Sequence, residues 1–313
     1  MIGIRSLGYL LLLGCAPVAL MADSKLPDVT FESRASGLSI AVGGKPFAEY
    51  VFEDGLTTRP FFKDLSVPGG ARITRNRPPK PGVDPVDHAT MHPGLWMAFG
   101  DIGGADFWRN KDRVRHVEFV EEPKGGPGRG EFAVRNRYEK SGKAIGEEVA
   151  KFTILPCPEG VLLIWDSTFK PEGKALVFGD QEEMGLGIRM ATPLTVKHGK
   201  GRILNSEGLK NEPELWGKPA AWCAYDGPIG EAGEREGVIL MTHPENFRAS
   251  RFHARDYGLL VANPFGINAF TNGEKSAVTV EPGKTLRLRF GVCVFQGKPD
   301  YKVVYADYLK AAR

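Results

Sequence analysis

Hydrophobic and polar residues alternate along much of the chain, a pattern typical of β-strands with one buried face. Four segments are also rich in β-branched and aromatic residues: 161–169, 237–243, 276–280 and 285–295. In the last of them an apolar residue recurs at every second position from Leu286 to Val294, which places these side chains on one face of a strand. Because Pro282 and Gly283 favour a type II turn, we expect 276–280 and 285–295 to pair as a hairpin.

One segment near the C-terminus has the periodicity of a helix instead. Asp300 can cap it, and apolar or aromatic residues follow at helical spacing: Tyr301, Val304, Tyr305, Tyr308, Leu309 and Ala312. The chain shows no internal repeat and no long linker, so we expect a single domain over 27–313. The many strands and the one terminal helix (300–312) predict an all-β protein. Its fold class is a large two-layer antiparallel β-sandwich over 28–295 with a short C-terminal helix.

The first 22 residues resemble a secretory signal peptide. Arg5 precedes an apolar run, and small residues follow up to Ala22, where cleavage is expected. Pro17 interrupts the run, which is too short to predict a membrane span, and we expect none in the mature chain. The letters "LLGC" ending at Cys15 also resemble a lipoprotein box, so a lipid anchor at Cys15 is an alternative. Either reading predicts export, to the periplasm, the outer membrane or the medium.

Composition narrows the class of protein further. The 313 residues are 42% hydrophobic and 25% charged, with a net charge of +3 and no dense Lys/Arg tract, so nucleic acid is not the expected partner. Beyond Cys15 the cysteines are Cys157, Cys223 and Cys293, with no CxxC pair. At most one disulfide can form, and Cys293 fits a small buried hydrophobic residue. Stability must therefore come from a core.

Candidate chemistry begins in the segment "DHATMHPGLWMAFGDIGGADFW", residues 87–108. His88 and His92 are four apart, which places both on one side of a helix or strand. They could be acid–base groups, metal ligands, or hydrogen-bonded residues that organise a turn. The Glu of H-E-x-x-H is missing, and the sequence requires no cofactor. A metal held by the histidines would need a third ligand, for which there are four candidates: His243, His253, Asp101 and Glu183.

The same segment combines tryptophans with carboxylates. Glycines surround Asp101, but their spacing matches neither GxGxxG nor GxxxxGK, so a phosphate site is not indicated. Trp96 and Trp108 bracket the loop, and Asp106 lies beside Trp108. Indole faces pack against sugar rings and carboxylates accept hydrogen bonds from hydroxyls, so the set suits a sugar site. The alternative is that both tryptophans belong to the core.

Three further segments carry polar and aromatic clusters. Residues 179–194 hold Glu183 and Arg189, which could bind a substrate or form a structural ion pair. Residues 205–228 hold Trp216 in a polar loop that leads into a strand. The last segment, 241–266, carries six candidate substrate or acid–base residues: His243, His253, Arg255, Asp256, Tyr257 and Asn263. His253 and Arg255 are two apart and face the same way on a strand.

Together the four segments, in this order, resemble the PmoA-like family of secreted bacterial proteins, which carries the label "methane oxygenase". The resemblance covers about residues 28–313. Where the first segment of the family reads D-H-x-H-H-R-x-L-W, this chain has Thr90 and Met91 near the middle and Pro93 in place of the Arg. The resemblance implies a galactose mutarotase-like β-supersandwich, a fold whose members usually act on sugars, although a fold alone does not establish a function.

The leading interpretation is a carbohydrate-active enzyme of the epimerase, lyase or glycoside-cleaving type. His88 or His92, with His253, would do acid–base work, and Glu183 would be their carboxylate partner. The other expected roles are hydroxyl or uronate binding by Arg189 and Arg255 and ring stacking by Trp96, Trp108 and Trp216. The alternatives are a non-catalytic glycan-binding protein and a copper or other metal oxygenase. We expect the four segments to converge on one concave pocket, because buried His, Asp and Arg need partners.

Overall fold

The computed structural model describes residues 26–229 and 233–313. Its strands are β1 (Asp28–Arg34), β2 (Gly37–Val42), β3 (Lys45–Val51), β4 (Phe61–Lys63), β5 (Leu95–Phe99), β6 (Arg113–Pro127), β7 (Arg129–Lys140), β8 (Lys143–Cys157), β9 (Gly160–Pro171), β10 (Leu176–Phe178), β11 (Met184–Arg189), β12 (Arg202–Asn205), β13 (Trp222–Ile229), β14 (Glu234–Thr242), β15 (Arg251–Arg255), β16 (Leu259–Asn263), β17 (Val278–Val280) and β18 (Leu286–Gln296). Its helices are η1 (Thr192–Leu194, 3₁₀), α1 (Asn211–Leu215), α2 (Asn268–Thr271) and α3 (Tyr301–Ala311).

The expected signal peptide and the lipid site at Cys15 lie outside the described residues. Within those residues, no helix has the length and apolar character needed to cross a membrane.

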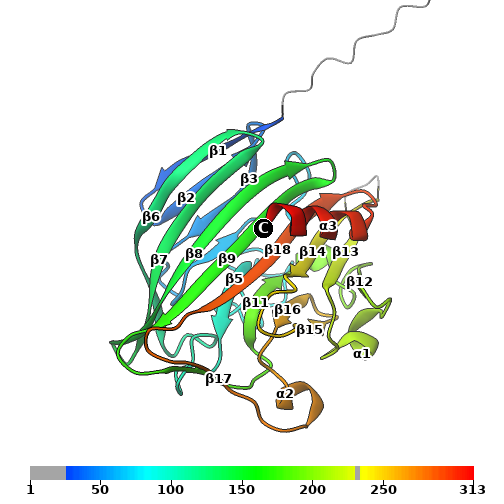
Figure 1. Cartoon of the computed structure of the whole chain (residues 1–313). Helices are drawn as coiled ribbons and strands as arrows, with labels where there is room; N and C mark the ends of the chain where they lie inside the picture. The colour runs from blue at the N-terminus through cyan, green and yellow to red at the C-terminus, as the bar shows by residue number, and fades with distance from the viewer. Residues whose placement is uncertain (1–25, 230–232) are drawn as a thin grey trace, which may run out of the picture.

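Sixteen of the described strands form one continuous sheet, in the order β12-β13-β14-β18-β9-β8-β7-β6-β1-β2-β3-β4-β5-β11-β16-β15. Neighbouring strands in it pair antiparallel. The sheet folds over where β6 meets β1, through only two residue pairs. One half, from β12 to β6, forms what we name the front layer, and the other half, from β1 to β15, forms the back layer (Figure 1). The expected all-β antiparallel sandwich is therefore confirmed.

Aromatic side chains fill the space between the two layers. The ring of Tyr50, on β3, lies 5.2 Å from that of Phe132, on β7, and 5.3 Å from that of Phe152, on β8. Phe62, on β4, lies 5.6 Å from Trp165, on β9. Each of these rings is 3% exposed or less. The alternating residues of facing strands thus interdigitate, as in other two-layer β folds.

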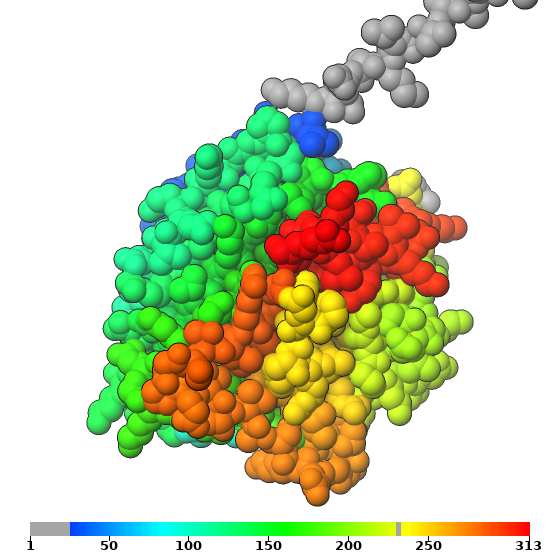
Figure 2. All heavy atoms as spheres, viewed as in Figure 1, coloured from blue at the N-terminus to red at the C-terminus, as the bar shows by residue number. Residues whose placement is uncertain are grey.

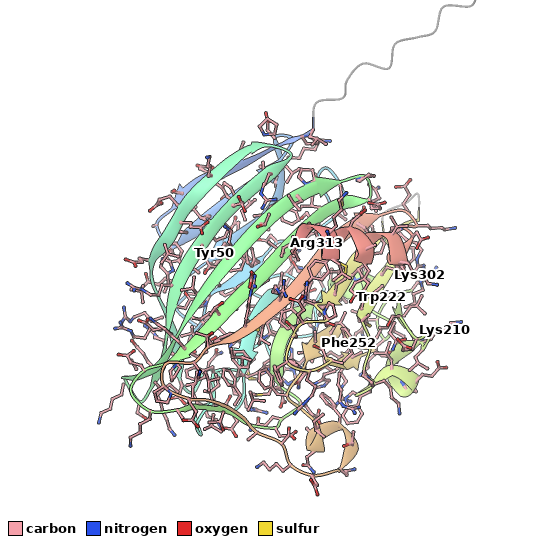
Figure 3. The ribbon with its side chains drawn as sticks, viewed as in Figure 1. Tyr50, Lys210, Trp222, Phe252, Lys302 and Arg313 are labelled. Atoms are coloured by element: carbon pink, nitrogen blue, oxygen red, sulfur yellow. The ribbon has the colours of Figure 1, made fainter. Side chains whose placement is uncertain are left out.

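The C-terminal helix α3 covers the outer face of the front layer (Figures 1 and 2). Asp300 caps it by accepting hydrogen bonds from the backbone N–H groups of Lys302 and Val303. Its apolar side packs on residues of β9, β13, β14 and β18, and Trp222 lies beside the first turn (Figure 3). The helix expected over 300–312 is confirmed, and its apolar stripe is the face that it buries.

The expected hairpin between 276–280 and 285–295 is wrong. Lys284 N–H does donate to the carbonyl of Glu281, and Gly283 has φ +81°, so the predicted turn is present. However, β17 pairs with β10, whereas β18 pairs with β14 and β9. A turn alone does not decide pairing, because the apolar residues of β18 are buried only at the centre of the front layer.

Candidate functional site

The outer face of the back layer carries most of the expected site residues. Opposed residues of antiparallel strands point to the same face, and here Trp96 on β5 is opposite Gly187 on β11, which is opposite Val261 on β16, which is opposite His253 on β15. We name this line of residues the back-layer row. Phe61 lies in the same apolar cluster as Trp96 and Val261, and it continues the row onto β4.

Gly187 lets the two tryptophans lie against the sheet. A Cβ atom at Gly187 would stand 2.9 Å from Cζ2 of Trp96 and 3.2 Å from Cη2 of Trp108. Both tryptophans are at most 1% exposed, and their rings meet edge to face with centroids 5.3 Å apart. They form the floor of the face, so the alternative that they are core residues describes their burial correctly.

A single turn places His88 and His92 above this floor. The backbone N–H of His92 donates to the carbonyl of His88 at 3.0 Å, which brings the two rings one above the other. Their centroids are 4.7 Å apart at 22°, and His92 in turn stacks on Trp96 at 5.1 Å and 14°. His88 holds φ +50°, an unfavourable conformation for a residue with a Cβ. We name this column of three rings the histidine stack.

Asp87 orients His88 from the side. Its Oδ2 lies 2.9 Å from Nδ1 of His88, and both carboxylate oxygens accept from the guanidinium of Arg189, at 2.9 and 3.0 Å. Arg75 lies 3.5 Å away. Burial alone would raise the pKa of Asp87, but hydrogen bonds from Arg189 and His88 and the charges of Arg189 and Arg75 lower it to about 2. The carboxylate is thus ionised and fixed against the imidazole.

His92 and His88 differ in exposure. The side chain of His88 is 42% exposed, whereas His92 is only 4% exposed. Burial, followed by the charge of Arg189 and other nearby cations, lowers the pKa of His92 well below its usual value. Its Nδ1 is buried without a hydrogen-bond partner. His92 is therefore a neutral ring that supports His88, which changes the acid–base role expected for it.

Tyr257 connects the histidine stack to a second group of charges. The guanidinium of Arg189 lies 4.5 Å from the centroid of its ring, and the His88 ring is nearly parallel to it at 6.5 Å. Burial raises the pKa of Tyr257, while the charges of Arg189 and Arg255 act in the opposite direction. Both arginines are therefore close enough to influence the phenol.

The second group surrounds His253. Arg255 donates from Nε to Nε2 of His253 at 2.9 Å and from Nη1 to Glu212 at 2.7 Å. Burial first, then the charge of Arg255, lowers the pKa of His253 to about 4. Because its Nε2 already accepts a hydrogen bond, His253 is a neutral, occupied ring rather than the acid–base group that was expected. Trp216 lies under Arg255, with the guanidinium 5.5 Å from its ring centroid.

Two neighbouring carboxylates complete this group. Glu183 accepts from Nη2 of Arg109 at 2.7 Å, and Arg109 also contacts Asp106 at 3.2 Å. Glu182 lies 3.4 Å from Nη2 of Arg255. Burial raises the pKa of Glu182, and the charge of Glu183 adds to this, although Arg255 opposes it. Glu183 thus forms an ion pair with Arg109 and not with Arg189, and Glu182 is the carboxyl that retains a proton most readily.

Of four other expected residues, three make structural hydrogen bonds and one lies away from this face. Asp101 accepts from the N–H of Gly104 within its own turn, and Asp256 exchanges hydrogen bonds with Glu212 at the start of α1. Asn263 braces the segment just before β11 by donating to the carbonyls of Gln181 and Glu182. His243 lies in the front layer, 6.1 Å from the ring of Tyr308, and the fold does not bring it to this face.

Sequence reasoning missed the partners that position the expected residues: Asp87, Arg75, Arg109, Glu182 and Glu212. Asp87 and Glu182 each lie directly beside an expected residue, so adjacency to His88 and to Glu183 was the available signal. Arg75 and Glu212 come from distant loops, and only the fold reveals them.

The described residues include no group of three or more His, Cys, Asp or Glu side chains placed to hold a metal ion. Cys157, Cys223 and Cys293 are free thiols. The donor set that the metal-oxygenase alternative would need is therefore not found in the parts of the chain that are described.

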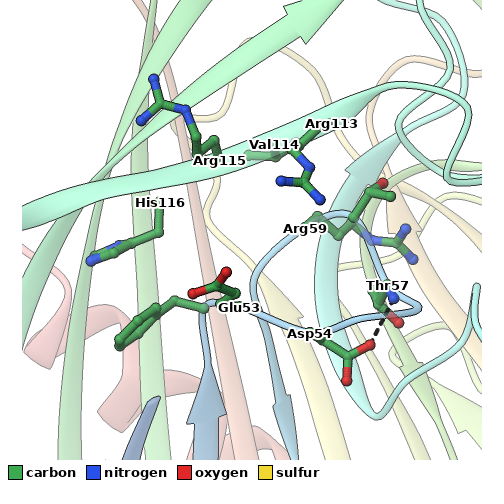
Figure 4. Close-up of a pocket in the computed structure, with 10 residues that line it drawn as sticks. Glu53, Asp54, Thr57, Arg59, Arg113, Val114, Arg115 and His116 are labelled. Carbon is green, nitrogen blue, oxygen red and sulfur yellow. Dashed lines mark hydrogen bonds between the residues drawn. The ribbon is translucent and has the colours of Figure 1, made fainter. Parts of the chain in front are cut away.

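A separate cleft of about 200 Å³ lies between the segment after β3 and the start of β6 (Figure 4). Glu53, Arg113 and His116 face it, while Arg59 reaches from its wall toward the ring of Trp96, 5.8 Å away. His116 stacks on Phe52 at 4.4 Å. The volume of this cleft is below the range of about 300–1,000 Å³ typical of ligand pockets, so we do not place the functional site in the cleft.

The fold and this face define an all-β sandwich with a polar, histidine-bearing site on the outer side of one layer. Residues 37–308 match the family described as "family of unknown function (DUF6807)", and the chain belongs to that family. The match does not support the expected PmoA-like label. No curated protein matches the sequence.

Several solved structures are similar to this chain. They include the GalM/aldose epimerase homologue from C. elegans, with a TM-score of 0.35 and 9% identity over 86% of this chain and 100% of that one. The GH36 alpha-galactosidase AgaA from Geobacillus stearothermophilus has a TM-score of 0.42 and 12% identity, over 88% of this chain and 40% of that one. A polysaccharide lyase has a TM-score of 0.35 and 10% identity, over 92% of this chain and 35% of that one. The chain thus spans well under half of the last two proteins. Because the TM-scores are low, these likenesses carry no argument about function.

Proposed function

We propose that this is an exported carbohydrate-active protein that performs acid–base chemistry on a sugar held at the back-layer face beside His88. The observation that supports it best is the Asp87–His88 pair: an ionised carboxylate 2.9 Å from Nδ1 of a half-exposed imidazole. Export rests on the leader sequence at residues 1–22. The mutarotase-like kinship implied by the sequence resemblance belongs to this proposal as well.

The Asp87–His88 pair suits proton transfer. With Asp87 accepting the Nδ1 proton, the neutral His88 ring has a lone pair on Nε2, which lies on the side of the ring away from Asp87. Arg189 prevents Asp87 from turning away because it binds both carboxylate oxygens. Below His88 the ring of His92 prevents the imidazole from collapsing onto the sheet. His88 is therefore the group we assign to take a proton from, and return it to, a sugar oxygen or carbon.

Glu182 is the partner we assign as the proton donor. Its raised pKa increases the fraction that carries a proton. Glu183 is instead held in an ion pair by Arg109 at 2.7 Å. The sugar would lie over Tyr257, whose ring is 6.5 Å from that of His88 and offers an apolar face with a hydroxyl.

The proposal is tested by incubating the protein with a panel of neutral and acidic sugars, from monosaccharides to hexamers, and following both binding and product formation. His88→Ala and Asp87→Asn should abolish turnover, while His198→Ala, at an exposed histidine elsewhere, should leave it unchanged. Binding that persists in His88→Ala, with no turnover in the native chain, would support the non-catalytic glycan-binding alternative instead. If no sugar binds, or if His198→Ala is as damaging as His88→Ala, the proposal is wrong.

A further inference from the structure

A second cleft lies on the same outer face of the back layer, beyond the site just described. It has a volume of about 430 Å³, within the range typical of ligand pockets. Its floor includes Gly37, Val51 and Phe61. These residues continue the back-layer row, because Gly37 is opposite Val51, which is opposite Phe61, and Phe61 belongs to the cluster of Trp96.

The cleft and the histidine stack are close enough for one short polymer to reach both. From β2 to β5 the row crosses three interstrand spacings, about 14 Å in all. The loop that carries the histidines is linked to the cleft through Thr57. Thr57, beside the cleft, donates to the carbonyl of Thr90 at 2.8 Å and accepts from Nη2 of Arg77 at 2.6 Å. Arg77 lines the cleft itself, with its side chain 6% exposed and its Nε without a partner.

The charges of the cleft indicate what kind of molecule would fit. Three basic and three acidic side chains line it and cancel in sum: Arg34, Lys63, Arg77, Glu49, Glu53 and Asp54. Lys63 pairs with Glu49 at 2.7 Å, and Arg77 pairs with Asp54. Near the histidine stack, Arg189 is paired with Asp87, which Arg75 also approaches at 3.5 Å, and in the neighbouring group Arg255 is paired with Glu182 and Glu212. Paired donors and acceptors suit hydroxyl groups, whereas a uronate or sulfate would need an uncompensated cation.

From these observations we infer that the cleft is a second sugar-binding subsite, and that the ligand is a neutral, extended glycan which occupies the cleft and the histidine stack together. This inference rests on the proposed function. Linking two subsites through one ligand makes the second contact intramolecular, so affinity should rise with chain length until both are filled. Monosaccharides and acidic oligomers should gain little.

The test is calorimetric titration with neutral oligomers of glucose, mannose, xylose and galactose, each from one to six units, and with oligogalacturonates of the same lengths. Ala35 is exposed at the rim of the cleft, so Ala35→Trp should fill it without touching the core. It should weaken a binding hexamer by about tenfold or more and leave the monosaccharide within about twofold. Glu53→Gln, at another exposed lining residue, should weaken the hexamer in the same direction. The matched control, Ala249→Trp, fills a cleft lined by His243 and Tyr305 in the other half of the fold and should change neither.

Three results separate the subsite from the proposed function. If hexamers bind no better than monosaccharides, or if Ala35→Trp and Glu53→Gln leave hexamer affinity unchanged while His88→Ala abolishes turnover, the subsite is wrong and the proposed function stands. If the acidic oligomers bind more tightly than the neutral ones, the inferred ligand class is wrong. If no sugar binds at all, the proposed function is wrong and the subsite falls with it.

Discussion

At the scale of single residues, the fold gives similar side chains different chemistry. His88, His92 and His253 all lie on the back-layer face, yet only His88 is half-exposed and paired with a carboxylate. His92 is enclosed by rings and arginines, and Nε2 of His253 accepts from Arg255. The sequence placed all three in the site because histidine type and spacing are visible in it. Burial and hydrogen-bond occupancy are not visible, so it could not rank them.

The two buried histidines should remain neutral in mildly acidic solution. Their depressed pKa values mean that protonation is resisted in the folded state, about 4 for His253 and well below the usual value for His92. In ring-resolved NMR spectra of histidine-labelled protein, both should show the neutral form at about pH 5.5, while in denaturant they should titrate near the ordinary value of about 6.5. Imidazolium signals from His92 in the folded protein at that pH would refute the assignment.

Asp87→Asn should cost both activity and stability. The change leaves the guanidinium of Arg189, 1% exposed, without its compensating charge, which we expect to cost about 2–4 kcal/mol. Because the folded pKa of Asp87, about 2, is below its ordinary 3.8, the loss should be full above pH 3.8 and shrink as the pH falls through 2. Denaturant unfolding against pH measures this. Glu32→Gln, which removes an exposed pair with Arg34, should change stability little.

At the scale of elements, periodicity identified strands but not all of their partners. The alternation in 285–295 correctly predicted β18, and the helical stripe predicted α3. The expected hairpin failed because β17 pairs with β10, which lies much earlier in the chain, before β11 to β16. Similarly, nothing in the sequence of β11 shows that Gly187 makes room for Trp96 on β5 and Trp108 in the loop after β5. Local pattern fixes the strand, while pairing depends on which faces the whole sheet buries.

Gly187→Ala should disturb the site through its floor. The new Cβ would meet Trp96 at 2.9 Å and Trp108 at 3.2 Å, and both rings are fully enclosed. Overpacking of this kind costs about 1–3 kcal/mol, and displacement of Trp96 should also move the stacked His92 and His88. Thermal unfolding together with sugar affinity would show it. Gly126→Ala is the control, because Gly126 is also in a strand and has nothing within 4 Å of its Cβ; equal effects would contradict the packing argument.

At the scale of the whole molecule, the layered fold was predictable and the site's position was only partly so. Strand-rich segments with Gly/Pro turns indicated a sandwich, and burial arguments brought residues of all four polar segments to one face. His243 was wrongly grouped with them. It follows β14, which belongs to the front layer, whereas β15 is the last strand of the back layer. Instead of the expected single concave pocket, these residues form a row along one face of the back layer.

The core between the layers also holds an ionisable group. Glu148, 2% exposed, accepts hydrogen bonds from Ser167, Asn136 and Tyr138, and burial raises its pKa despite them. Because the pKa of Glu148 is raised in the folded state, the stability that it contributes is fully present below its unfolded pKa. That stability is lost as the pH rises through its folded pKa. Stability of Glu148→Gln relative to the native chain should therefore increase as the pH rises above the ordinary glutamate value of 4.5. A difference that is constant with pH would contradict it.

The central claim is that a sugar binds at the Asp87–His88 face, and ring spectra of histidine-labelled protein, with and without a sugar that binds, test it most directly. The chain has six histidines, so the spectrum contains its own controls. If the sugar binds there, the signals of His88 should shift on binding, and those of the stacked His92 should shift to a lesser extent. The signals of His198 and His243 should stay in place. A sugar that binds and shifts His198 or His243 but leaves His88 unmoved would contradict it.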